Sequence, residues 1–252
     1  MAGYIVYEGP SRIDGAPIVV IVTGLGPKSE RSKNDKTGEM AQVWILRADV
    51  SPTDAINTGD DESICGDCPL RGLLEDGANR FRACYVSVRN APLAVWNAYQ
   101  AGSYEYLTDE TWLDQSTRLG AYGDPAAVPV PVLRDLVRRG TGHTGYTHQW
   151  RQRKFRFLRN LVMASADSLD DKREAQAAGW RTFRSLEDGE EMDQTEIYCP
   201  SDRGIQCADC GACDGSREQE NFVPLRRSVA IYAYGSPAVM GSYGRMRERR
   251  TA

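Results

Sequence analysis

Four cysteines lie within fifteen residues near the C-terminal end of the chain, at Cys199, Cys207, Cys210 and Cys213. Two Cys-x2-Cys steps share Cys210, and the fourth thiol lies eight positions before Cys207. Four thiolates form a complete ligand set for a tetrahedral zinc ion or for a 4Fe-4S iron–sulfur cluster. The segment therefore predicts a metal site and leaves these two metals open. A closed four-thiolate site is typical of a structural role.

A second set of three cysteines, Cys65, Cys68 and Cys84, occurs earlier in the chain. Three thiolates leave one coordination position open, where a substrate can meet a metal. Two alternatives remain: one of the two histidines, His143 or His148, completes a zinc site, or the thiols are simply buried. All seven cysteines could also surround one pair of neighbouring metal centres.

The state expected for these cysteines depends on the cellular compartment. No stretch approaches the ~20 apolar residues that a membrane-spanning helix needs, and the N-terminal residues lack the pattern of a secretory signal. We therefore expect a cytoplasmic protein with no membrane partner. In a reducing compartment, clustered cysteines bind metal more often than they form disulfides, and the odd count of seven argues against a fully paired set.

The composition limits the partners of the protein. The 252 residues are 41% hydrophobic and 26% charged, which fits one large domain or a domain with a small appendage. A net charge of -4 argues against a broad basic face for duplex DNA, so any nucleic-acid surface must be local. Two basic segments, 148–159 and 245–250, are local candidates. The alternative is a solvated helix face for the first and a frayed, solubilising terminus for the second.

The pattern of apolar runs divides the chain into three regions. Region 1–83 is β-rich and contains a Cys-x2-Cys loop, region 84–186 alternates strands with helices, and region 187–252 combines the cysteine-rich segment with a final strand and a basic tail. In the first region, strands are expected over 4–7, 18–23 and 42–46. The final strand is expected over 229–234.

The middle region predicts a parallel sheet. Its strands are expected over 84–88, 116–123, 143–147, 160–166 and 180–185. Its helices are expected over 91–102, 148–158 and 167–179, and a loop followed by a helix over 124–140. Alternation of this kind is typical of βα units. The predicted fold class is therefore α/β, with a partial TIM-like barrel favoured over an open doubly wound sheet.

The loops that follow these strands carry the candidate site residues, because barrel enzymes place their sites at the carboxyl ends of the strands. Asp124 and Asp167 are candidates for a catalytic base and nucleophile, and His148 for a further catalytic group. The substrate-binding candidates are Tyr146, Arg151, Ser165 and Arg184. The alternatives are structural: Asp124 starts a helical turn, Asp167 caps a helix, and His148 makes a structural hydrogen bond.

Several phrases, among them SICGDCPLRG, LGAYGDPAAVP, TGYTHQW, MASADS and the terminal cysteine run, together resemble a family of cysteine-rich tailed-phage and prophage proteins of uncharacterised activity. The resemblance implies action inside a bacterial host. The partial-barrel pattern is also faintly similar to the transglycosylase-like barrels with which some phages insert 7-deazaguanines into DNA. That likeness implies aspartates at strand ends, with Asp124 and Asp167 as the positional counterparts, and a zinc held by cysteines and a histidine.

These observations predict a phage-encoded metalloprotein that acts as an enzyme on nucleic acid or a nucleotide, in a base-modification or transglycosylase-like reaction. One alternative is an iron–sulfur enzyme, either redox or with an open-site cluster, since CADCGAC is similar to the cluster-binding run of bacterial-type ferredoxins. The other is a non-enzymatic zinc protein that binds a host protein or DNA, and the acidic composition suits a protein partner better than duplex DNA.

Overall fold

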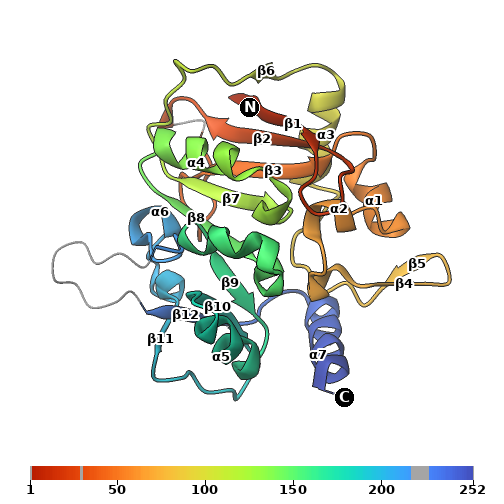
Figure 1. Cartoon of the computed structure of the whole chain (residues 1–252), viewed down its shortest axis with the longest axis vertical. Helices are drawn as coiled ribbons and strands as arrows, with labels where there is room; N and C mark the ends of the chain where they lie inside the picture. The colour runs from red at the N-terminus through yellow and green to blue at the C-terminus, as the bar shows by residue number, and fades with distance from the viewer. Residues whose placement is uncertain (1, 29–30, 217–226, 252) are drawn as a thin grey trace.

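The computed structural model describes residues 2–28, 31–216 and 227–251. Ten strands form one large, mostly parallel sheet, in the order β11-β12-β10-β9-β8-β7-β3-β2-β1-β6 (Figure 1). Strands from all three regions predicted from the sequence join this sheet. The molecule is therefore a mixed α/β protein whose sheet runs through every region.

One end of the sheet is an antiparallel meander of β1 (Ala2–Pro10), β2 (Pro17–Leu25) and β3 (Ala41–Arg47). The β-branched run of β2 suits its central position in the meander. Ile18 to Val22 are fully buried, so the strand is covered on both faces of the sheet. Gly15 makes the turn between β1 and β2 at φ 87°, which favours glycine. The short β6 (Glu105–Tyr106) pairs with β1 at the edge.

The other part of the sheet is parallel and contains the predicted βα units. Its strands are β7 (Thr117–Tyr122), β8 (His143–Thr147), β9 (Met163–Ala166), β10 (Thr182–Leu186), β12 (Ser228–Tyr232) and β11 (Glu196–Tyr198). Each pairs in parallel with its neighbour, and β7 continues in parallel onto β3. The carboxyl ends of these strands consequently meet at one edge of the sheet.

Short helices connect the strands. The α-helices are α1 (Pro52–Thr58), α2 (Glu62–Cys65), α3 (Ala91–Gln100), α4 (Val130–Arg139), α5 (Leu169–Ala177), α6 (Cys207–Cys210) and α7 (Pro237–Thr251). The 3₁₀ helices are η2 (Pro69–Arg71), η3 (Pro125–Ala127), η4 (Gln149–Arg151), η5 (Arg153–Asn160) and η6 (Pro200–Arg203). A small hairpin of β4 (Leu73–Glu75) and β5 (Ala78–Arg80) stands apart from the main sheet (Figure 1).

The predicted helix over 167–179 is confirmed as α5, and its local chemistry explains its ends. The Ser168 hydroxyl accepts a hydrogen bond from the Asp171 amide at 3.0 Å, so Ser168 is the N-cap. Gly179 follows the last turn at φ 89°. The N-cap is therefore Ser168 and not Asp167, whose amide donates to the Asp171 carboxylate at 3.1 Å.

Three expectations about local structure are wrong. Residues 84–88 form no strand, because the Arg82 guanidinium donates to the carbonyls of Cys84 and Val86, both at 3.1 Å, in place of a strand partner. The basic segment 148–158 folds as the 3₁₀ helices η4 and η5. The tail 245–250 belongs to α7, whose Tyr243 is buried, and is not a frayed end.

The structure confirms the parallel βα units, but it does not confirm the partial TIM-like barrel. In the part of the chain that the structure describes, the strand order has two edges, β11 and β6, and these do not pair with each other. The parallel strands nevertheless place their carboxyl ends beside each other, which is the property on which the predicted site depends.

Candidate functional site

A cavity of about 480 Å³ opens at the carboxyl ends of the parallel strands. Residues at the ends of β7, β8, β9, β10 and β12 line it, together with the loop at 34–37 and part of α7. Its volume falls within the range of about 300–1,000 Å³ that is typical of small-molecule sites. We call it the main cavity.

The structure brings five of the predicted catalytic and substrate-binding residues to this cavity: Asp124, Tyr146, His148, Ser165 and Asp167. They come from the ends of three adjacent strands, β7, β8 and β9. Their convergence follows from the parallel order of those strands, since consecutive βα units deliver the residues after each strand to the same edge.

Asp124 is buried, and hydrogen bonds occupy its carboxylate. One oxygen accepts from the Ala126 amide at 2.8 Å, and the other accepts from the His148 amide at 2.9 Å. Burial raises the pKa of Asp124, against the opposing effect of these bonds and of the Thr147 hydroxyl. The carboxylate thus starts η3 and ties the end of β7 to the end of β8, which corresponds to the structural alternative for this residue.

His148 and Asp167 face each other inside the cavity. The imidazole Nε2 lies 3.4 Å from a carboxylate oxygen of Asp167, and both side chains are largely buried. Burial alone would lower the pKa of His148, but the neighbouring Cys68 and Asp167 outweigh it and raise that pKa well above its usual value. The imidazole therefore connects a cysteine on one side with a carboxylate on the other.

The N-terminal cysteine group consists of Cys65, Cys68 and Cys84. Cys65 ends α2, Cys68 precedes η2, and Cys84 follows β5; all three line the main cavity. The Cys68 amide donates to the Cys65 carbonyl at 3.3 Å, which closes a tight turn around Gly66. Burial, then Cys68, Asp61 and Cys84, raise the pKa of Cys65 well above its usual value. The three thiols consequently lie close enough to influence one another.

The C-terminal cysteine group consists of Cys199, Cys207, Cys210 and Cys213. The Gly211 amide donates to the Cys207 carbonyl at 3.1 Å, and Gly211 has φ 59°, so the Cys-x2-Cys-Gly run forms a tight turn. Burial raises the pKa of Cys213 to about 12; the Tyr146 hydroxyl bonded to it lowers that pKa, while the other three thiols raise it. Cys207 of this group also lines the main cavity.

The two cysteine groups suit a thiophilic metal by donor type, but neither is closed around one. All seven cysteines are free thiols, as expected for metal ligands. Over residues 2–28, 31–216 and 227–251, however, no three His, Cys, Asp or Glu side chains already stand in a metal-coordinating arrangement. Metal binding would thus require the thiols within a group to move closer together.

Aromatic and cationic side chains that the sequence did not single out form another wall of the main cavity. The Arg118 guanidinium donates to the Tyr85 hydroxyl at 2.5 Å, and Lys36 Nζ donates to the Tyr234 hydroxyl at 3.0 Å. The rings of Tyr85 and Tyr234 have their centroids 5.9 Å apart. Lys36 and Tyr234 are 198 positions apart in the chain, so no local pattern could have revealed their contact.

The Tyr122 hydroxyl is a further group that the sequence reasoning missed. Tyr122 ends β7, is 3% exposed and lines the main cavity. Among the described residues its hydroxyl has no hydrogen-bond partner. A buried hydroxyl of this kind is costly unless a hydrogen-bond partner satisfies it.

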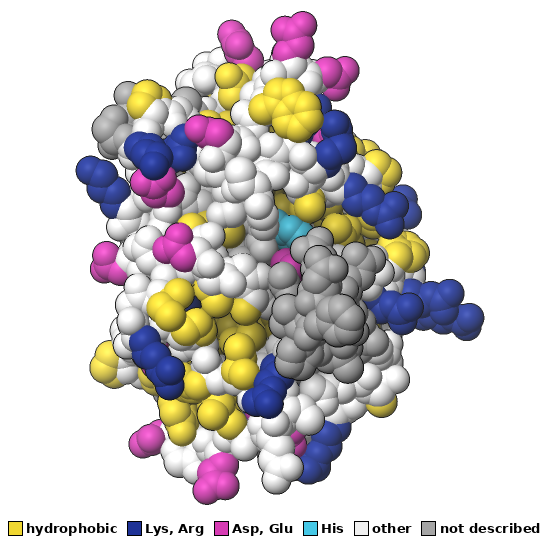
Figure 2. Space-filling view, turned by 90° about the vertical axis from the view of Figure 1, so that its left-hand side faces the viewer, with side chains coloured by type: hydrophobic (Ala, Val, Ile, Leu, Met, Phe, Trp, Pro, Cys, Tyr) yellow, Lys and Arg dark blue, Asp and Glu magenta, His cyan; other side chains and the backbone are white. Residues whose placement is uncertain are grey.

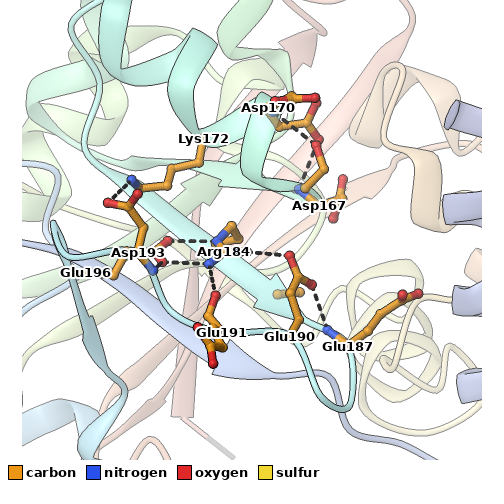
Figure 3. Close-up of polar contacts among 12 residues, drawn as sticks. Asp167, Asp170, Lys172, Arg184, Glu187, Glu190, Glu191, Asp193 and Glu196 are labelled. Atoms are coloured by element: carbon orange, nitrogen blue, oxygen red, sulfur yellow. Dashed lines mark hydrogen bonds and ion pairs between the residues drawn. The ribbon is translucent and has the colours of Figure 1, made fainter.

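Two predicted substrate-binding residues lie elsewhere. Arg184 is fully buried and donates to the Glu196 carboxylate at 2.9 and 2.8 Å and to Glu190 at 2.5 Å (Figure 3). Arg151 pairs with Asp171 at 2.5 Å on α5. Neither arginine is among the described residues that line the main cavity, so we do not retain either as a substrate-binding residue.

The distribution of charged side chains on the surface (Figure 2) is consistent with the net charge of -4. On the face shown in Figure 2, Lys and Arg side chains are interspersed with Asp and Glu rather than gathered into one basic surface. Cationic groups at the main cavity are thus a local feature, as the net charge requires.

Comparison with known proteins gives no relative: no protein family, no curated protein and no solved structure matches this chain. As for the membrane, the helices of the described residues include none that is long and apolar enough to cross it.

Proposed function

We propose that this protein is a metal-binding enzyme that modifies a base of nucleic acid or of a nucleotide in the main cavity. The observation that carries the proposal is the composition of that single cavity. It combines a His148–Asp167 pair, the thiols of the N-terminal cysteine group, and a wall of tyrosines with Lys36 and Arg118. Flat aromatic walls suit a base, and cations at the mouth suit a phosphate. We retain the phage origin that the sequence resemblance implies, and the parallel βα units support the proposal only by placing these residues at one edge of the sheet.

Asp167 is the residue to which we assign the chemistry. Its carboxylate faces a histidine at 3.4 Å in a buried site, where a charged group interacts more strongly than in water. In a base exchange, the carboxylate would bond to the sugar carbon as the bond from that carbon to the base breaks, and a protonated His148 would give its proton to the departing base. A second base would then bond to the sugar carbon as the bond to the carboxylate breaks, and its ring-nitrogen proton would pass to His148, which restores both residues. Asp124 holds the backbone around this pair and does not react.

The metal sites we propose are the two cysteine groups. Zinc held by the C-terminal cysteine group would fix the segment that carries Tyr146's partner, Cys213, against the sheet. The N-terminal cysteine group supplies three thiols. His148 interacts with Cys68 and is the histidine that could complete this site. A zinc or iron centre at that position would supply Lewis-acid or redox chemistry at the cavity wall.

A second candidate function is an iron–sulfur enzyme with an open cluster site. The specific observation in its favour is that all three thiols of the N-terminal cysteine group line the main cavity. A cluster with three cysteine ligands would present its unligated iron to a substrate bound there. Acid-labile sulfide in the purified protein distinguishes this function from the zinc alternative.

The test is a comparison of nucleosides from bacteria that produce the protein. DNA and RNA are digested and analysed by mass spectrometry for the wild type, for Asp167→Asn and for the matched control Asp170→Asn, whose carboxylate on α5 is 92% exposed. We expect a new nucleoside with the wild type and with Asp170→Asn, and at least about 100-fold less with Asp167→Asn. No new nucleoside, or an equal yield from Asp167→Asn, would contradict the proposal and favour a non-enzymatic zinc protein that binds a host partner.

A further inference from the structure

A second cavity adjoins the main one. It has a volume of about 350 Å³ and shares a wall with the main cavity, formed by Asp35, Lys36 and the end of β12 from Ile231 to Tyr234. Its other lining residues are Tyr198, Ser201 and Asp202, from β11 and η6. The two cavities thus lie side by side at the end of β12.

Each cavity contains a pair of tyrosines. In the main cavity the rings of Tyr85 and Tyr234 lie 5.9 Å apart at 39°. In the second cavity the rings of Tyr198 and Tyr232 lie 5.8 Å apart at 49°. Tyr234 thus supplies one ring of the pair in the main cavity, and Tyr232 supplies one ring of the pair in the second cavity. Both lie at the end of β12. The exposed fractions of Tyr85, Tyr232 and Tyr234 are 50%, 42% and 51%, so these rings present faces that a ligand can cover.

Charge differs between the shared wall and the second cavity. Lys36 lies between the two cavities, with Nζ 4.4 Å from the centroid of the Tyr234 ring. Asp35 lies beside Lys36 on the shared wall, whereas Asp202 lines only the second cavity and accepts from the Tyr198 hydroxyl at 2.5 Å. The Asp202 carboxylate disfavours a phosphate deep in the second cavity but not an uncharged base, whereas Lys36 favours a phosphate at the boundary.

We propose that the two cavities bind successive nucleotides of a single-stranded nucleic acid. The main cavity takes the base that is modified, Lys36 contacts the phosphate, and the neighbouring base stacks on Tyr198 and Tyr232. Tyrosine faces bind any base by stacking, and a base must leave the duplex before it can enter such pockets. The inference rests on the proposed function and narrows its substrate from nucleotides in general to a polynucleotide strand.

The experiment measures binding without requiring turnover. A fluorescently labelled single-stranded oligodeoxycytidylate, and its RNA counterpart, are titrated with the protein, and deoxycytidine monophosphate is used as a competitor. We expect the oligonucleotide to bind much more tightly than the mononucleotide. Tyr198→Ala, which changes only the second cavity, should weaken oligonucleotide binding about 5- to 100-fold and leave mononucleotide binding unchanged. Tyr232→Ala, on the shared wall, should weaken oligonucleotide binding by a similar factor and by more than it weakens mononucleotide binding.

Controls separate stacking from other effects. Tyr198→Phe and Tyr232→Phe keep the ring and should bind like the wild type, and so should Tyr106→Ala, which removes an exposed tyrosine on β6. Because Tyr198 adjoins Cys199, variants are compared at equal metal content, and Tyr232→Ala provides an independent reading. A loss with Phe equal to the loss with Ala would overturn the stacking role.

The outcomes also separate this inference from the proposed function. If the mononucleotide binds as tightly as both oligonucleotides, the polynucleotide inference is wrong, while a new nucleoside in the cellular assay would still support base modification. Binding of neither oligonucleotide overturns the inference outright. Tight oligonucleotide binding with no new nucleoside would support the strand-binding cavities and contradict the enzymatic function.

Discussion

Two thiols of the C-terminal cysteine group lie in a small apolar cluster and only Cys207 of that group lines the main cavity, whereas all three thiols of the N-terminal cysteine group line it. Cys199 and Cys213 are buried with Met163, Val229 and Ile231. In the N-terminal group, by contrast, every thiol faces the cavity that contains the His148–Asp167 pair. The same donor atom is thus placed in two surroundings, one that packing dominates and one that a ligand can reach. We infer a structural role for the first and a role in the chemistry for the second.

Buried ionic contacts strengthen the contrast. Arg181 at the start of β10 donates to the carbonyl of Ala212 at 2.6 Å and to Asp214 at 3.0 Å, on both sides of Cys213. In the N-terminal group the main ion pair is that of Arg71 with Asp61, at 2.7 Å. Unlike the contacts of Arg181, this pair secures α2 and η2 beside the cavity and leaves the thiols facing it. The free energy of unfolding should therefore depend more on the C-terminal group.

The largest expected effect tests this difference directly. Cys210→Ser removes a proposed ligand of the C-terminal cysteine group and should lower the free energy of unfolding by about 4 kcal/mol or more if that group holds a metal, since loss of a structural metal ranks among the largest single-residue effects. Cys68→Ser should lower it by less than about 1.5 kcal/mol and still abolish base modification. Urea unfolding followed by circular dichroism measures both. Equal losses of stability would remove the distinction between the groups.

The next effect concerns the segment that leads into the C-terminal cysteine group. Arg184→Ala leaves the fully buried Glu196 carboxylate without its partner and should cost about 3–5 kcal/mol of unfolding free energy. Arg173→Ala on α5, where the arginine is 63% exposed, is the matched control and should change stability by less than about 0.5 kcal/mol. A small effect of Arg184→Ala would mean that this segment is not fixed by its buried ion pairs.

A smaller effect distinguishes the helix cap from the proposed catalytic carboxylate. Ser168→Ala removes the N-cap of α5 and should lower the free energy of unfolding by about 1 kcal/mol without loss of base modification. Asp167→Asn should do the reverse, with little change in stability and a large loss of product. If Asp167→Asn destabilises the protein more than Ser168→Ala does, the effect of Asp167 on activity is structural.

The smallest effect is a pH dependence. Lys172, which is buried, pairs with Asp193 at 2.7 Å, and its hydrogen bond holds the pKa of Asp193 well below its usual value. Because the folded-state pKa is lowered, the stabilisation is complete above the ordinary aspartate pKa of about 4 and is lost as the pH falls below it. Asp193→Asn should therefore lower stability at neutral pH and flatten its decline in acid. Denaturant titrations across that range measure this, and an unchanged slope would contradict the assignment.

Much of the fold could be predicted from local patterns. The β-branched run 18–23 and the alternation of strands with helices from 116 to 186 give clear signals, and the structure contains these elements except for the helix expected over 148–158, which is two 3₁₀ helices. The tail 245–250 could not be assigned, because its helix depends on the packing of Tyr243 and on an Arg247–Glu190 ion pair at 2.9 Å. Contacts of that kind are invisible in a local window.

The candidate site was predictable only where topology creates it. Residues that follow adjacent parallel strands meet by geometry, so Tyr146, Ser165 and Asp167 could be proposed from spacing alone. Arg184 was assigned to the site because it lies near a strand end, but its side chain pairs with Glu196 inside the protein. The contact between Lys36 and Tyr234 joins residues 198 positions apart in the chain, and no local sequence pattern indicates it.

The most direct measurement is the metal and acid-labile sulfide content of the anaerobically purified protein, for the wild type, Cys68→Ser and Cys210→Ser. We predict one metal centre for each cysteine group in the wild type, with Cys68→Ser and Cys210→Ser each losing one centre and only Cys210→Ser losing stability with it. Zinc without sulfide would support the base-modifying enzyme, and iron with sulfide the open-site cluster enzyme. A wild-type protein that contains neither metal would contradict the assignment of both cysteine groups.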